Sequence, residues 1–449
     1  MPARYAFTVA VLGLLFMVML LTPEISRSVP SFARQTELAC SNCHTVFPEL
    51  TPFGRLFKLQ GYTLSSEEAI EVKDSTEKVS LRLPKIPPFS AMAQTSYTQL
   101  KKSQPGTQNG NVSFPQQFSF FFAGEISNEV GGFVQVTWDD ESSAFSMDLM
   151  DFRFSHHTTL ADRALILGLT LNNTPTVQDV WNSTTAWGFP YISSNVAPTP
   201  TASPLVAGGL GSLGPSVAGL GGYSLYNNFL YTEFTLYRTT LSSTAHPPDS
   251  NATYTMKSVA PYWRVALQHQ WTNLYFEVGT YGMYANFYPQ GVVGPQDRYT
   301  DYGFDMQAMT ELGEGNLTAH TTWVGEKRTL EATFGAGGSE RPSENLNLFK
   351  IDANYYYKKR YGVALGYFQS SGDRDTLMYA PAPVTGSRTG NPNSSGLILE
   401  LDYLPWLNTK IWAQYIAYNK FNGASSNYDG SGRDAADNNT LYLSLWLAM

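Results

Sequence analysis

The sequence has few cysteines, little charge and, after its first 28 residues, no long apolar run. Charged residues make up 15% of the chain, well below the ~25% usual for a soluble domain. No stretch beyond residue 28 is long enough for a membrane-spanning helix. The net charge of −8 argues against nucleic acid and an anionic lipid surface as partners. Two cysteines are also too few for a zinc site built on two thiolate pairs.

Aromatic residues and glycine are abundant instead. The chain holds 14% aromatic residues, with 27 Tyr and 37 Gly. This composition suits strands in which lipid-facing apolar residues alternate with small polar ones.

The first 28 residues are predicted to be a signal peptide. Arg4 gives a positive start, residues 6–21 are nearly all apolar, and Ser26-Arg27-Ser28 offers small residues for cleavage. The alternative is an uncleaved membrane anchor, because the apolar run approaches spanning length. Either reading places the rest of the chain outside the cytoplasm.

The two cysteines occur together in Cys40-Ser41-Asn42-Cys43-His44. Thiols three positions apart can add to the two vinyl groups of one porphyrin, and the adjacent His44 then reaches the iron. A disulfide between Cys40 and Cys43 would close a very small ring and gain little chain entropy. A thioredoxin-type redox pair should open a helix after a strand, and no such pattern surrounds it. We therefore predict one covalent haem c with His44 as its proximal ligand.

The haem motif lies in a short segment, residues 29–88, which we expect to be mainly helical. Residues 51–62 have the spacing of one amphipathic helix ending at Gly61. The acidic stretch 65–78 is expected to be solvated, and the prolines of 84–88 to form a stiff linker.

From residue 89 to 449 the pattern is that of a transmembrane β-barrel. Segments of about ten residues alternate in period two and are separated by turn-rich stretches. The predicted fold is thus all-β, a sixteen-stranded antiparallel barrel preceded by the haem segment. The sixteen strands are expected near residues 89–100, 116–126, 131–139, 147–157, 163–171, 218–226, 229–239, 259–270, 274–284, 299–310, 316–334, 345–357, 361–369, 395–404, 410–419 and 439–449.

Short and long connections alternate along these strands, as expected when every second link is a periplasmic turn. The connection 172–217 is long and rich in Pro, Gly, Ser and Thr. It either folds inward and narrows the pore or forms a disordered surface loop.

The two faces of the strands can be separated by parity. The leucines expected to face lipid are Leu165, Leu167, Leu169, Leu171, Leu441, Leu443, Leu445 and Leu447. The residues expected to line a polar lumen are Gln135, Asp151, Arg153, Glu277, Asp301, Asp305, Asp352, Glu400 and Asp402. The alternative is the solvated face of a soluble sandwich.

The sixth haem ligand is not evident from the sequence, because residues 29–88 contain no methionine and no second histidine. The iron is either five-coordinate or weakly ligated, or the barrel supplies the ligand. Met92, at the periplasmic start of the first strand and of lumen parity, is the first candidate for the distal ligand. It can also be an ordinary apolar residue. His157, at the periplasmic end of the fourth strand, is the second candidate.

Side chains with oxygen ligands crowd the last outer loop, residues 420–438. They could hold calcium or an incoming ferrous ion, or serve as hydrogen-bonded turn residues. The residues concerned are Asn422, Asn427, Asp429, Asp434 and Asp437.

Both ends of the chain resemble a known family. Near the motif, Phe32-Ala33-Arg34-Gln35, the run from Phe47 to Gly54, and Gly61-Tyr62 are similar to the haem segment of the fused outer-membrane cytochrome–porins of iron-oxidising bacteria. The chain also resembles that family towards its end, in Phe421-Asn422-Gly423, Asn427-Tyr428-Asp429-Gly430, Asp437-Asn438-Asn439-Thr440 and Trp446. Only Cys40, Cys43 and His44 are carried over from the family as site residues.

The resemblance implies a single-haem protein of the outer membrane, in contact with its lipid, with the haem in or under the barrel. Such a protein takes electrons from extracellular Fe(II) and passes them to a periplasmic cytochrome c or another periplasmic carrier. Two other functions remain open. One is a porin whose haem segment is a plug or sensor, and the other is a conduit that exports electrons.

Overall fold

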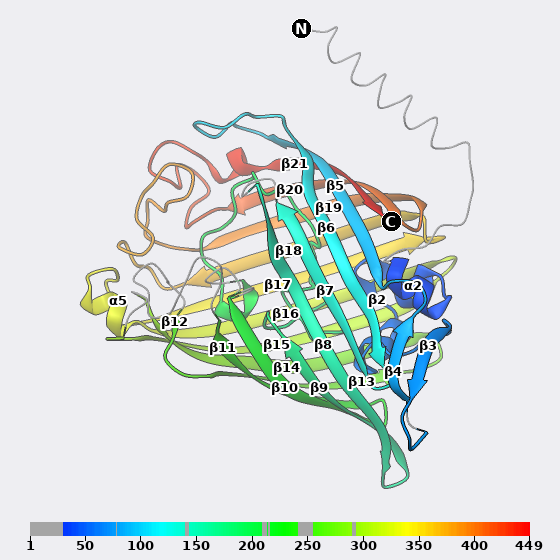
Figure 1. Ribbon diagram of the computed structural model, residues 1–449. Helices are drawn as coiled ribbons and strands as arrows, with labels where there is room; N and C mark the ends of the chain where they lie inside the picture. The colour runs from blue at the N-terminus through cyan, green and yellow to red at the C-terminus, as the bar shows by residue number, and fades with distance from the viewer. Residues whose placement is uncertain are drawn as a thin grey trace, which may run out of the picture.

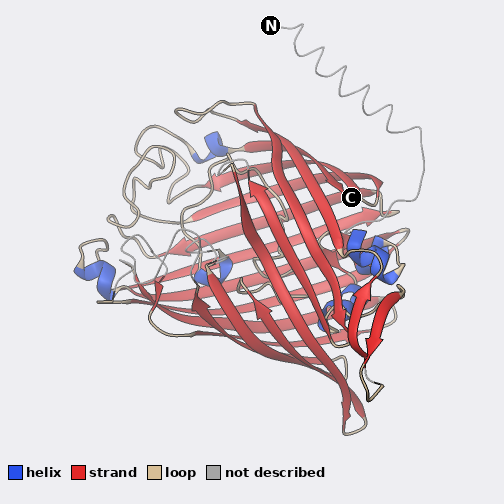
Figure 2. Cartoon of the chain, in the orientation of Figure 1, coloured by secondary structure: helices blue, strands red, loops and turns tan. Residues whose placement is uncertain are grey.

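The structure is a computed structural model that describes residues 30–77, 79–139, 143–208, 213, 216–240, 255–289 and 293–449. The predicted signal peptide, residues 1–28, lies outside the described residues. Strands make up most of the molecule, with a few short helices (Figure 2). Within the described ranges no helix has the length and apolar character needed to cross a membrane.

The strands form one closed antiparallel barrel. Successive strands of the ring pair in sequence order except at the two-residue β12, where β11 pairs with β13, and β21 pairs with β5 to close the ring. The strands are β5 (Phe89–Leu100), β6 (Asn111–Ser127), β7 (Val130–Asp139), β8 (Ala144–Leu160), β9 (Arg163–Asn172), β10 (Val217–Tyr226), β11 (Leu230–Thr239), β12 (Thr255–Met256), β13 (Ala260–Gln270), β14 (Leu274–Tyr288), β15 (Asp297–Leu312), β16 (Gly315–Thr329), β17 (Ser343–Tyr357), β18 (Tyr361–Gly372), β19 (Ser394–Trp406), β20 (Thr409–Lys420) and β21 (Thr440–Ala448).

The predicted count of sixteen strands is confirmed. The two-residue β12 continues the pairing of β13 along β14 and is not a separate crossing of the barrel. The expected strand 316–334 is too long at its end, because β16 stops at Thr329 and the one-turn helix α5 (Glu331–Gly335) follows. The backbone N–H of Ala332 and Thr333 in α5 bond to the Asp297 carboxylate.

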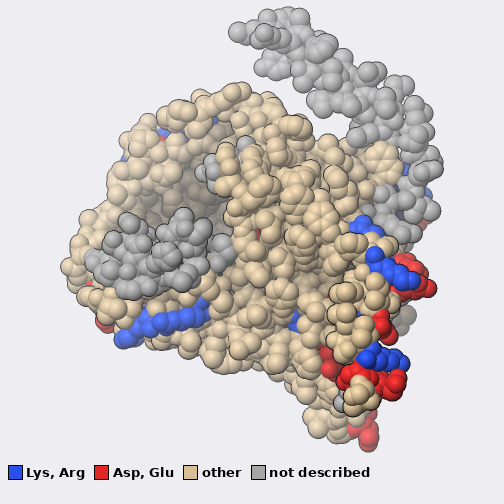
Figure 3. Space-filling model, in the orientation of Figure 1, with Lys and Arg blue, Asp and Glu red and all other residues tan. Residues whose placement is uncertain are grey.

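Side chains alternate between the outer wall and the lumen as their parity predicts. Leu167, Leu169 and Leu171 expose 44%, 54% and 51% of their surface on the outer wall. The predicted lumen residues, among them Asp151, Glu277 and Asp305, are buried inside the barrel. Figure 3 shows a side wall with few charged side chains, most of which lie near the two ends of the barrel. The wall is therefore apolar and the interior polar.

The N-terminal segment enters the end of the barrel that has the short turns (Figure 1). Its elements are α2 (Pro30–Thr36), α3 (Cys40–Cys43), β1 (His44–Val46), β2 (Glu49–Leu50) and α4 (Pro52–Leu59). The predicted helix within 51–62 is thus present as α4, with Thr51 as its N-cap accepting a hydrogen bond from Gly54 N at 3.1 Å. Side chains of the segment bond to the inner wall, as Tyr62 does to Asp151 of β8 at 2.7 Å.

The described residues of the stretch 65–78 are largely exposed, as expected, and part of the stretch also forms one strand of a hairpin. Strands β3 (Ala69–Lys73) and β4 (Val79–Pro84) pair next to β6 (Figure 1). Ile70 pairs with Leu83, and Val72 pairs with Leu81, across the hairpin. These apolar residues recur at every second position, but the charged residues between them conceal the alternation in the sequence. Arg82 ties the hairpin to the barrel through Glu125 at 3.1 Å.

In the connection between β9 and β10, the described residues 173–208 fold into the lumen, and we name them the inward loop. Trp181 is fully buried, and its Nε1 donates to the Tyr275 hydroxyl of β14 at 2.7 Å. Gln307 of β15 donates to Trp181 O at 2.7 Å. Leu205 N bonds to Glu326 of β16 at 2.7 Å. The open question is settled in favour of the inward fold, because the lumen wall supplies polar partners for the backbone of the loop.

Candidate cofactor site

The two cysteines and the histidine are held in one tight turn. Helix α3 is a single turn that begins at Cys40 and ends at Cys43, and His44 follows as the first residue of β1. Helix α4 packs directly against this turn. A Cβ atom on Gly54 would lie 2.2 Å from Cys43 O, so only glycine permits this approach. Thr51 N donates to Cys43 O at 2.9 Å and fixes the contact.

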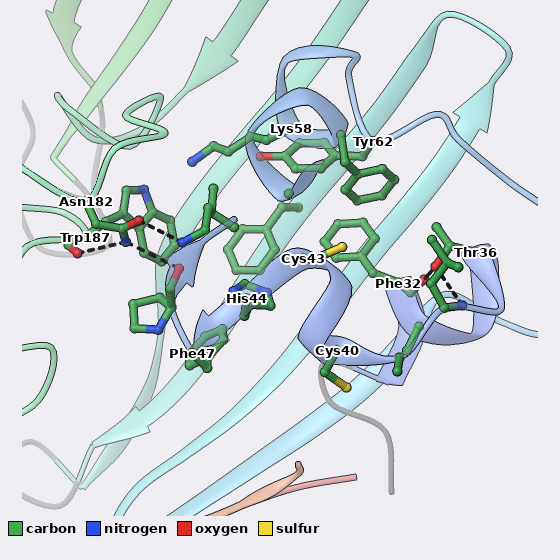
Figure 4. Close-up of a pocket in the computed structure, with 18 of the residues that line it drawn as sticks. Phe32, Thr36, Cys40, Cys43, His44, Phe47, Lys58, Tyr62, Asn182 and Trp187 are labelled. Carbon is green, nitrogen blue, oxygen red and sulfur yellow. Dashed lines mark hydrogen bonds between the residues drawn. The ribbon is translucent and has the colours of Figure 1, made fainter. Parts of the chain in front are cut away.

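The turn borders a cavity inside the barrel (Figure 4). The cavity contains about 840 Å³ of space between protein atoms, including part that is open to solvent. Small-molecule and cofactor pockets are usually ~300–1,000 Å³ and mostly apolar. Phe32, Phe47 and Phe57 supply much of the apolar lining, with Cys40, Cys43 and His44 on one wall.

The surroundings of His44 favour its neutral form, which can act as a metal ligand. Burial lowers the pKa of His44 to about 4, although the backbone of Pro48 and Glu49 and the Glu49 charge oppose this effect. The imidazole is therefore uncharged near neutral pH, which is the form that binds a metal ion. Its Nδ1 is buried without a hydrogen-bond partner among the described residues.

The cysteines are in the thiol form, as attachment of a porphyrin requires. Cys40 and Cys43 form no disulfide. Burial, with a smaller effect of Cys40, raises the pKa of Cys43 to about 11, so its thiol stays protonated. Paired thiols, a neutral histidine and a large apolar cavity together fit a porphyrin attached through two thioethers.

A polar wall, formed by Lys58 of α4 with Asn182 and Trp187 of the inward loop, lines another part of the cavity. The Lys58 ammonium donates to Val177 O at 2.6 Å and Asp179 O at 3.0 Å. It also lies 4.8 Å from the centre of the Trp187 ring. Burial lowers the pKa of Lys58 to about 7, and the neighbouring Arg153 adds to this effect.

Sequence reasoning missed Lys58. The available signal was its place four residues after Gly54, on the helix face that packs towards the haem motif. Its partners in the inward loop lie more than a hundred residues away, so their contact with α4 could not be inferred from the sequence.

Glu49 fastens the site to the rest of the molecule. Its carboxylate is fully buried and accepts a hydrogen bond from Thr45 within the segment. It also accepts from Thr318 of β16 at 2.7 Å, Asn354 of β17 at 2.6 Å and the Tyr191 hydroxyl of the inward loop at 2.9 Å. One side chain thus joins the segment, the barrel and the inward loop.

The two candidates for the sixth ligand do not line this cavity. Met92 is buried in the lumen as its parity predicts, but it lines a neighbouring cavity that also borders Phe47 and Trp187. His157 is exposed near the short-turn end of β8. No methionine and no second histidine is found among the described residues lining the cavity with His44. Ligation by Met92 or His157 stays a prediction.

The oxygen-rich outer loop has the geometry of hydrogen-bonded turns. The Asp429 carboxylate accepts hydrogen bonds from the backbone N–H of Val384, Ser431 and Arg433, at 3.0, 2.8 and 3.1 Å. No group of three or more potential metal ligands occurs among the residues that the structure describes.

Comparisons with known proteins add only a general likeness. No protein-family model and no curated protein sequence matches the chain. An anion-selective porin from Comamonas acidovorans is 11% identical, with a TM-score of 0.47, over 80% of this chain and 98% of the porin. OmpF of Salmonella typhi, in complex with daunomycin, is 12% identical with a TM-score of 0.45, over 80% and 97%. A loop-deletion mutant of OmpT, an outer membrane protein of Vibrio cholerae, is 11% identical with a TM-score of 0.42, over 80% and 98%. At these values we draw no conclusion from the likeness, and the fold rests on the strand pairing described above.

Proposed function

We propose that this chain is an outer-membrane protein that carries one covalent haem c in its lumen. It accepts electrons from an extracellular donor, Fe(II), and passes them to a periplasmic cytochrome c or another periplasmic carrier. Cys40 and Cys43 would hold the haem covalently and His44 would be its proximal ligand. When bound, the haem supplies reversible one-electron chemistry.

The outer wall of the barrel supports the membrane location. A closed barrel leaves no unpaired strand edge, and its outward leucines form an apolar surface. Leu169 exposes 54% of its surface, which would be costly in water and is favourable in lipid. The short-turn end would then face the periplasm and the long loops the outside.

The single observation that carries the proposal is the position of the C-x-x-C-H turn on the wall of a large apolar cavity inside a closed barrel. The hydrocarbon core of a bilayer is ~30 Å thick, so one haem cannot cross it alone. A polar lumen would let a small donor approach a haem that is enclosed within the barrel.

A second candidate is a solute or ion channel whose N-terminal segment is a plug or sensor. The sixteen-stranded barrel and its polar interior favour this alternative. The inward loop and the N-terminal segment both occupy the lumen, which would narrow such a channel. A conduit that exports electrons is the third possibility, although one haem suits it less than a chain of haems.

Purified protein in detergent can separate these functions. We expect a Soret band, haem that stays attached under denaturing conditions, and rapid haem reduction when Fe(II) is added anaerobically at fixed pH. The matched control is Cys40→Ser with Cys43→Ser, which should lose the covalent haem. A mature protein without a Soret band would end the proposal. Ion conductance in a planar bilayer without haem reduction by Fe(II) would instead support the channel.

A further inference from the structure

Lys58 is a buried cation without a carboxylate partner. It is 7% exposed, and no carboxylate oxygen lies within 4 Å of its Nζ in the part of the chain that the structure describes. Lys410, buried to a similar degree, contacts Glu400 at 2.9 Å and Asp402 at 3.2 Å. Burying an unpaired ammonium is costly, so an anion beside Lys58 would stabilise its charged form.

Other charged groups near Lys58 do not fill this role. The carboxylate of Asp179 is turned into its own loop, where it accepts hydrogen bonds from the backbone N–H of Trp181, Ser183 and Thr184 at 2.8–3.1 Å. Asp151 is paired with Arg153 at 2.8 Å. Among the described residues, two backbone carbonyls bond to the Lys58 ammonium, and an ammonium has three protons to donate.

In Figure 4 the side chains of Cys40 and Cys43 lie on one side of His44, and the end of the Lys58 side chain lies on the other side with Asn182 and Trp187. In a c-type haem the two thioether bonds are formed on one edge of the porphyrin, and the two propionate carboxylates extend from the opposite edge. A porphyrin attached at Cys40 and Cys43 would therefore direct its carboxylates towards the polar wall.

We propose that Lys58 is the anchor for a haem propionate, with its ammonium held in place by the carbonyls of the inward loop. This inference rests on the proposed haem. Lys58 is then a positioning residue, and the inward loop becomes part of the cofactor site. The lowered pKa of Lys58 agrees with the absence of an anion beside it. A carboxylate within hydrogen-bond distance of the ammonium would favour the charged form and raise this pKa.

The test uses the full-length protein with its haem and three substitutions, Lys58→Gln, Lys58→Met and Lys58→Arg. We expect all three to keep covalent haem and unchanged iron coordination. The neutral variants should shift the propionate bending bands in resonance Raman spectra and lower the midpoint potential, because removing a positive charge favours ferric haem. Lys58→Arg should remain close to wild type. Lys358→Gln, at an exposed site, is the matched control and should change neither measurement.

Each other outcome decides against the anchor. If Lys58→Arg and the neutral variants all change the spin or coordination state, Lys58 is an iron ligand, because arginine cannot replace it there. If no variant moves the Raman bands or the potential, Lys58 does not contact the propionate. Lys58→Met provides a second neutral variant if Lys58→Gln does not fold. Wild-type protein without haem would instead refute the proposed function itself.

Discussion

At the scale of single residues, the C-x-x-C-H pattern is evident from the sequence, whereas the residues that surround it in the fold are not. Cys40, Cys43 and His44 complete within five residues the spacing that covalent haem attachment requires. Glu49 and Lys58 take their roles from partners in β16, β17 and the inward loop. Contacts over such sequence distances depend on the closed barrel, so the local pattern gives no signal for them.

Substitution of Gly54 tests how closely helices α3 and α4 must approach each other. We expect Gly54→Ala to destabilise the segment by about 1–3 kcal/mol, because its Cβ would overlap Cys43 O at 2.2 Å. The melting temperature in detergent and the covalent haem content would both fall. Gly335→Ala is the control, since a Cβ there meets no atom within 4 Å. Equal stability of the two variants would contradict the close packing.

Glu49 tests the attachment of the segment to the barrel. Glu49→Ala leaves the buried donors of Thr318, Tyr191 and Asn354 without their acceptor, at about 1–3 kcal/mol for the lost partner. Limited proteolysis should then cleave the N-terminal segment faster than in wild type. Glu129→Ala removes a half-exposed carboxylate that contacts only His156 in the described ion pairs, and it should leave the cleavage rate unchanged.

At the scale of elements, strands were easier to predict than the segments that fill the barrel. Period-two patterns of about ten residues located each strand, because one side of the wall meets apolar surroundings and the other a polar lumen. The inward loop has no such period, and its composition suits a surface loop equally well. The hairpin β3–β4 was missed because charged residues flank its few apolar pairs.

The inward loop provides a prediction at this scale. Replacing residues 177–187 by a glycine–serine stretch of equal length removes Trp181 and its bonds to Gln268 and Tyr275. We expect a higher single-channel conductance in planar bilayers, since this part of the lumen would fill with water. Replacing residues 105–108, an exposed stretch of the β5–β6 loop, should not alter the conductance. Unchanged conductance in the first variant would mean that the loop does not limit passage.

At the scale of the whole molecule, the apolar outer wall and the closed ring of strands favour a lipid environment. Leu169→Arg places a charge on the outer wall, and near the middle of a bilayer this costs about 2–4 kcal/mol. We expect a smaller fraction of folded, heat-modifiable barrel in lipid vesicles. Leu377→Arg alters a leucine that is 51% exposed in an outer loop, and it should fold like wild type. If both variants insert equally well, Leu169 does not face lipid.

The route by which the segment reaches the lumen has a consequence for the order of biosynthesis. The segment runs directly into β5, the strand that pairs with β21 to close the ring. Once the ring is complete, Cys40 is buried and Cys43 is half-buried behind a continuous wall. If an enzyme attaches the proposed haem, it needs both sulfur atoms exposed, so attachment would precede docking of the segment into the barrel. The haem would then be attached in the periplasm before the barrel is completed in the outer membrane.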